Sequence, residues 1–168
     1  MSQGAVRRIF RLAALTLILL GLPAGQGQAL QCSPRFPEAC QSCSELERAF
    51  RHHLSDKPVS RARAVWTPIY AAYFLDCFDL AQGWLKQGVS ASNGGEQNDL
   101  LSTVVLWDRF GYVHRRDWAK LLVDHGATLD HKGLDGMTTG ARLRSAAAAG
   151  DGTVARLLAN IESWLGIR

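Results

Sequence analysis

The sequence predicts an all-α protein, a short solenoid of about three stacked helix pairs that begins with a capping helix. Apolar residues recur at helical spacing in several segments after residue 43, and glycines end two of these segments. Similar segments also return every 36 to 38 residues. This period is typical of stacked helix pairs, because one pair alone cannot bury its apolar face.

Residues 1–29 have the layout of a secretory signal peptide. Arg7, Arg8 and Arg11 precede an apolar run of about eleven residues, which is too short for a transmembrane helix. Small residues then predict cleavage after Ala29. Two alternatives stay open: a retained membrane anchor, and a lipoprotein acylated at Cys32, although the residues before Cys32 match an acylation site poorly. The sequence thus favours a periplasmic or secreted protein without stable membrane insertion.

Removing this segment changes the charge of the protein. The net charge of +4 includes the three signal-peptide arginines, so the mature chain carries about +1. A nearly neutral chain gives little support to a nucleic-acid partner. The remaining residues fit one domain, with a cysteine-containing segment and capping helix over 30–66 and repeats over 67–168.

The cysteines Cys32, Cys40, Cys43 and Cys77 all follow the predicted cleavage site. An even number of cysteines in an exported chain predicts two disulfides. A redox pair or half of a zinc site at Cys40 and Cys43 is the alternative, but no strand–helix pattern and no second close pair accompanies it. We favour the pairing Cys32–Cys40 with Cys43–Cys77, which ties the N-terminal segment to the first repeat.

The capping helix is expected to begin at a capping box, in which Ser44 accepts a backbone N–H and Glu47 reaches back. Pro58 is expected to end it. Its predicted apolar face contains Leu46, Ala49, Phe50 and Leu54.

Three repeat units are predicted over 67–98, 99–132 and 133–168. Their second helices are the similar segments 80–89, 118–127 and 154–159, of which the first two end at Gly88 and Gly126. Trp84 and Trp164 are assigned to the core.

These units resemble the ankyrin-repeat family. The opening Thr67-Pro68-Ile69-Tyr70, the Leu121-Leu122 helix that ends in Gly126-Ala127, and the turn Asp135-Gly136-Met137-Thr138 carry the resemblance. The second unit lacks the Thr-Pro opening, and the period exceeds the family's 33 residues. Another helix-pair repeat, such as the tetratricopeptide type, is the alternative. The resemblance implies a protein-binding module.

No residue pattern predicts catalysis, a cofactor or a metal site. Ser90 lacks the second glycine and the preceding strand of a nucleophile elbow. The Asp124-His125 pair is expected at an exposed helix end. The segment 130–136 lacks the alternating ligands and the distal glutamate of a calcium loop.

A contact surface is predicted instead, because aromatic residues and arginine dominate binding hot spots. The family pattern places such residues on the first helices and the finger-like turns. The predicted contact residues are Trp66, Tyr70, Phe74, Trp107, Arg109, Tyr112, Arg115, Arg116, Arg142 and Arg144. Trp107, Phe110 and Trp118 could equally be core residues.

The predicted function is therefore non-catalytic binding of another protein in the periplasm. One specific form is an immunity protein against a periplasm-acting lipase or cell-wall hydrolase. The alternatives are an accessory or chaperone-like module for a periplasmic enzyme and, from another class, a hydrolase of unrecognised type.

Overall fold

The computed structural model describes residues 31–52, 67–92, 99–107, 109–133 and 135–167. Within these ranges the chain forms seven α-helices, one short 3₁₀-helix and no strand. The all-α prediction is confirmed. The predicted signal peptide lies outside the described residues.

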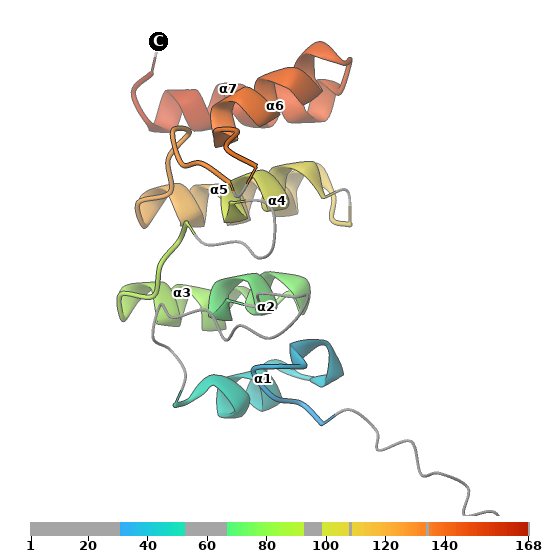
Figure 1. Cartoon of the computed structure of the whole chain (residues 1–168), viewed down its shortest axis with the longest axis vertical. Coiled ribbons are helices and arrows are strands. Elements are labelled where there is room, and N and C mark those ends of the chain that lie inside the picture. The colour runs from blue at the N-terminus through green and yellow to red at the C-terminus, as the bar shows by residue number, and fades with distance from the viewer. Residues whose placement is uncertain (1–30, 53–66, 93–98, 108, 134, 168) are drawn as a thin grey trace, which may run out of the picture.

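The chain begins with the 3₁₀-helix η1 (Pro37–Ala39) and α1 (Cys43–Phe50). Three pairs follow: α2 (Pro68–Phe74) with α3 (Phe78–Lys86), α4 (Leu100–Leu106) with α5 (Tyr112–Asp124), and α6 (Thr139–Ala148) with α7 (Gly152–Trp164). Figure 1 shows α1 and the three pairs as successive layers along the long axis of the molecule. No helix in the described ranges has the length and apolarity needed to cross a membrane.

Each pair begins at a side chain that caps its first helix. Thr67, Asp99 and Thr138 accept the backbone N–H three residues later, at 3.2, 2.8 and 3.1 Å. Such caps satisfy N–H groups that have no partner within the helix. In the second pair Asp99 therefore takes the place that threonine has in the other two.

Glycines end the second helices as predicted. Gly88 and Gly126 follow α3 and α5 with φ values of 90° and 96°. This left-handed conformation suits glycine because it has no Cβ.

The capping box of α1 differs from the prediction in its register. Ser42, not Ser44, is the N-cap and accepts the Glu45 N–H at 3.2 Å, while Glu45 accepts the Gln41 N–H at 2.8 Å. Both Ser42–Glu45 and Ser44–Glu47 fit the sequence pattern, and the helix begins at the earlier one. The predicted apolar residues Leu46 and Phe50 are fully buried, whereas Leu54 and Pro58 lie outside the described residues.

Two disulfides link the N-terminal layers. Cys32 pairs with Cys40, and Cys43 at the start of α1 pairs with Cys77 at the start of α3. Both pairs are those that the sequence favoured. The second bond fixes α1 against the α2–α3 pair.

Large rings fill the space between the α2–α3 pair and the α4–α5 pair. Trp118 of α5 is fully buried, and its ring centroid lies 5.2 Å from Tyr73 of α2 and 5.2 Å from Phe78 of α3. Trp84, 3% exposed, packs on Phe50 of α1, which confirms its assignment to the core. Trp164 is only partly buried against the core.

Candidate functional site

Tyr73 is the centre of the contacts between the first two helix pairs. Its ring meets Trp118, Phe110 and Trp107 edge-on, at centroid separations of 5.2, 5.4 and 5.9 Å. Its hydroxyl donates to the carbonyl oxygen of Val104 at 3.3 Å. Burial raises the pKa of Tyr73 to about 12, although Arg115 and Arg109 oppose this change. The buried ring thereby holds the end of α2 against α4 and α5.

An arginine–aromatic cluster lies at the surface beside Tyr73. We define it as Phe74, Trp107, Arg109 and Phe110. The Arg109 guanidinium lies 4.8, 5.7 and 5.4 Å from the centroids of the three rings in that order. Its Nη1 donates to the carbonyl oxygen of Phe74 at 2.8 Å. Arg109 is exposed and the three rings are half-buried, so the cluster presents one fixed charge on an apolar base.

An Asp–His pair adjoins this cluster. His114 packs against Phe110 with 4.5 Å between ring centroids, and its Nε2 lies 2.7 Å from Asp76 Oδ1. Asp76 has a φ of 59°, and it is the one non-glycine residue in the described ranges with positive φ. It ends α2 at the kind of position where Gly88 and Gly126 end α3 and α5. Side chains are strained in this conformation, and such strain is concentrated at functional sites.

The structure brings together three of the predicted contact residues, Phe74, Trp107 and Arg109. Arg115, by contrast, is a wrong prediction. It is 4% exposed and donates from Nη1 to the Val105 carbonyl oxygen at 2.8 Å. Helix α5 begins at residue 112, so Arg115 shares a helical face with the buried Trp118 and Leu122.

The other predicted contact residues lie elsewhere. Tyr112 accepts a hydrogen bond from Asn160 of α7 at 2.8 Å, and Arg144 of α6 pairs with Glu162 of α7 at 3.1 Å. Arg116 pairs with its neighbour Asp117 at 2.8 Å. Tyr70 is half-buried against the core. Trp66 lies outside the described residues.

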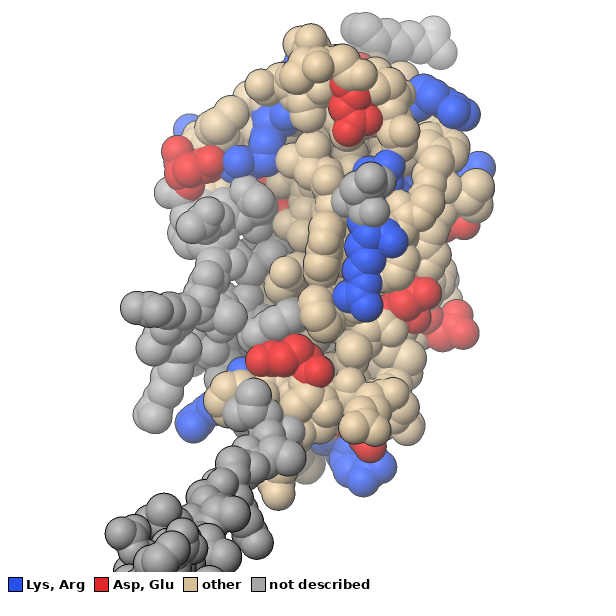
Figure 2. All heavy atoms as spheres, turned by 90° about the vertical axis from the view of Figure 1, so that its right-hand side faces the viewer, with Lys and Arg blue, Asp and Glu red and all other residues tan. Residues whose placement is uncertain are grey.

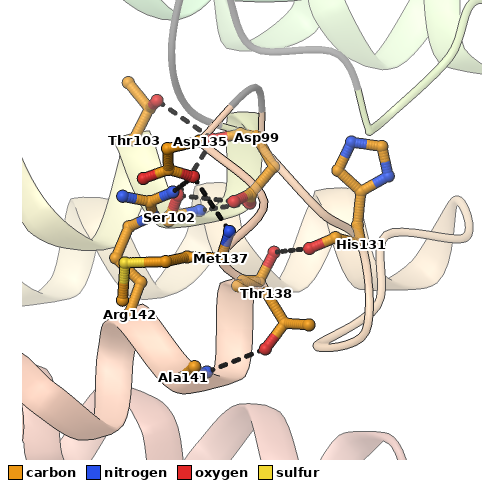
Figure 3. A network of polar contacts seen from close by, with 10 residues as sticks. Asp99, Ser102, Thr103, His131, Asp135, Met137, Thr138, Ala141 and Arg142 are labelled. Carbon is orange, nitrogen blue, oxygen red and sulfur yellow. Dashed lines mark hydrogen bonds and ion pairs between the residues drawn. The ribbon is translucent and has the colours of Figure 1, made fainter.

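Arg142 braces the turn before α6. Its Nη2 lies 2.7 Å from Asp135 Oδ1, an atom that also accepts the Met137 N–H at 3.0 Å. Figure 3 shows Arg142 pointing from α6 toward Asp135. The hydrogen bond from Arg142 holds the pKa of Asp135 below its usual value. The Arg142 side chain is 15% exposed, so its contacts are mainly internal.

The polar network in Figure 3 joins the start of α4, the turn before α6 and the start of α6. The carboxylate of Asp99 accepts from the backbone N–H and the hydroxyl of Ser102, at 2.8 and 2.6 Å. His131 takes part through its carbonyl oxygen, which accepts from the N–H and the hydroxyl of Thr139 at 2.9 and 3.3 Å. These contacts cap helices and close the turn over 132–138.

Two open hollows lie near the N-terminal helix. One hollow, of about 530 Å³, is lined by residues that lie between Gln31 and Ala49 in the sequence. The other, of about 460 Å³, lies between α1 and α3 beside Glu47 and Asp79. No histidine lines either hollow. Within the described ranges, His, Cys, Asp and Glu side chains form no group of three or more that could hold a metal ion. Basic and acidic side chains are interspersed on the face seen in Figure 2.

Tyr73, Asp76 and His114 were absent from the predicted contact set. A signal for His114 existed, because Phe110, His114 and Trp118 recur every four residues and so share one helix face. Asp76 stands in Leu75-Asp76-Cys77, where no glycine indicates the end of a helix.

No protein-family model, no curated protein and no solved structure matches this chain.

Proposed function

We propose that this chain is an exported, non-catalytic protein-binding module, and that its helix pairs form a short solenoid of the ankyrin-repeat type. The observation that carries the proposal is the arginine–aromatic cluster. Phe74, Trp107 and Phe110 surround an exposed Arg109, and arginine and tryptophan are among the residue types most enriched in binding hot spots.

Three features support the repeat type. Helices α2, α4 and α6 each begin at a capping Thr or Asp, α3 and α5 end in left-handed glycines, and a turn over 132–138 closes before α6. Stacked helix pairs of this kind leave one edge of each pair free for a partner.

The two disulfides support export, because such bonds persist in oxidising compartments. The periplasm of a bacterium, reached through cleavage near Ala29, is the compartment we propose. A partner that fits this location is an incoming toxic effector, so an immunity protein is the specific form of the proposal. The accessory-module form has the same binding surface and differs in the partner, which would be a resident enzyme.

The test uses site-specific cross-linking in cells. A photoreactive phenylalanine analogue at position 74, which leaves Arg109 in place, is expected to give a discrete cross-linked species, whereas the same analogue at the exposed Lys86 of α3 should give none. Absence of any cross-link at position 74, with the tagged protein exported and folded, would contradict a contact surface there. Co-expression with the product of the adjacent reading frame then separates the two forms, because only an immunity protein restores growth against a toxin.

A further inference from the structure

The guanidinium of Arg109 is fixed in place, and within the part of the chain that the structure describes it uses little of its hydrogen-bonding capacity. It has five N–H donors, and one of them is bonded to the carbonyl oxygen of Phe74. Three rings hold its plane, as described above. Among the described residues, no carboxylate lies within ion-pair distance of it.

The other arginines predicted as surface contacts differ in this respect. Arg116, Arg142 and Arg144 each pair with a carboxylate of this chain, on Asp117, Asp135 and Glu162. Arg109 instead leaves a positive charge exposed on a half-buried aromatic base. A partner group that supplies the missing negative charge would complete this surface.

We infer that Arg109 binds a side-chain carboxylate of the protein partner, on an Asp or Glu that is flanked by an apolar residue. This inference rests on the proposed binding function. The planar guanidinium matches a carboxylate in a two-point, charge-assisted contact. Because the side chain is already held by Phe74, Trp107 and Phe110, little rotamer freedom is lost on binding.

The neighbouring charge favours a carboxylate over a phosphate group. Asp76 lies two residues after Phe74, whose carbonyl oxygen binds Arg109, and its side chain is 46% exposed. Its negative charge repels a doubly charged phosphate more strongly than a singly charged carboxylate. The half-buried edges of Phe74, Trp107 and Phe110 fit the apolar neighbour of the acidic residue.

The test uses a phage-displayed library of random peptides, selected on the folded protein with both disulfides intact. The selected peptides should contain Asp or Glu beside an aromatic or aliphatic residue. The affinity of one selected peptide is then measured by calorimetry for the wild-type protein and for Arg109→Lys, Arg109→Gln and the control Lys86→Gln. We expect losses of about tenfold for Arg109→Lys and about a hundredfold for Arg109→Gln, with no change for the control.

A substitution in the peptide gives a readout that leaves the protein fold untouched. Replacing its acidic residue by the amide should weaken binding to the wild-type protein by the same factor, and should have no effect on the Arg109→Gln variant. Selected peptides without carboxylates, or equal binding of the acid and amide forms, would overturn the inference. Strong competition by millimolar inorganic phosphate would overturn it in favour of a phosphate group. If these outcomes occur while cross-linking at position 74 persists, the carboxylate inference fails and the proposed binding function stands.

Discussion

The carboxylate of Asp76 lies 2.7 Å from Nε2 of His114, and this contact joins the end of α2 to the first turn of α5. The same nitrogen lies 2.9 Å from Nε1 of Trp118, which can only donate. Donation to Asp76 requires a hydrogen on Nε2, whereas acceptance from Trp118 requires a lone pair there. One of these two hydrogen bonds therefore forms at a time, and a protonated ring favours the bond to Asp76.

Asp76→Gly should change the free energy of unfolding in two opposing ways. Glycine removes the strain at φ 59°, a gain of about 1 kcal/mol in the free energy of unfolding. It also removes the partly exposed contact with His114, which contributes up to about 1 kcal/mol. We expect a net change near zero in the wild-type chain and a gain of about 1 kcal/mol in the His114→Ala background. Urea denaturation of the wild-type protein, the two single variants and the double variant measures this difference. Equal effects of Asp76→Gly in both backgrounds would show that the contact between Asp76 and His114 contributes nothing to stability.

Tyr73 should make the protein sensitive to alkali. Its folded-state pKa of about 12 lies above the value of about 10 for an unfolded tyrosine. The resulting stabilisation is fully present below about pH 10 and is lost as the pH rises toward 12. Tyr73→Phe should lower stability at neutral pH by about 1 kcal/mol, because the bond to Val104 is lost. The variant should also lose less stability than the wild type between pH 10 and 12. An unchanged loss of stability, measured by urea denaturation at several pH values, would count against the role of Tyr73 in alkali sensitivity.

Arg115 and Arg116 offer a matched pair of neighbours. Arg115→Ala should lower the free energy of unfolding by about 2–4 kcal/mol, because it removes buried packing and leaves the Val105 carbonyl oxygen without its donor. Arg116→Ala should leave it nearly unchanged, since Arg116 and its partner Asp117 form a solvent-screened surface pair. Thermal and urea unfolding check both values. Comparable losses for the two variants would contradict the burial of Arg115.

The two disulfides should differ in their contribution to stability. Loop-closure entropy predicts about 4 kcal/mol for Cys43–Cys77, which spans 34 residues, and about 2.5 kcal/mol for Cys32–Cys40, which spans 8. The double variants Cys43→Ala/Cys77→Ala and Cys32→Ala/Cys40→Ala serve as controls for each other in urea denaturation. The reverse order of the two losses would show that native-state packing, not chain entropy, determines their effect.

The sequence predicted the helices well because their signals are local. Gly88 and Gly126 end their helices because glycine readily adopts the left-handed conformation. Thr67, which precedes Pro68, caps a helix through its side-chain oxygen. The prediction failed where two local patterns compete. Ser42 and Ser44 both match a capping box, and only the start of α1 at Cys43 decides between them.

The site was harder to predict because it depends on where α5 begins. With the helix starting at Tyr112, Arg115 turns inward and His114 turns toward Asp76. Phe74, Trp107 and Arg109 were selected by residue type, but their association depends on packing between α2 and the segment after α4. Tyr73 was missed because a buried tyrosine with a backbone partner has no distinctive sequence pattern.

The bond between Cys43 and Cys77 also determines how the chain behaves after a protease has cut it. Any single cleavage between these two cysteines leaves both products covalently joined. Such a nicked molecule keeps α1 attached to the layer of α2 and α3, and it migrates as one species until a reductant separates it. A molecule cut once between these two cysteines would in this way remain in one piece.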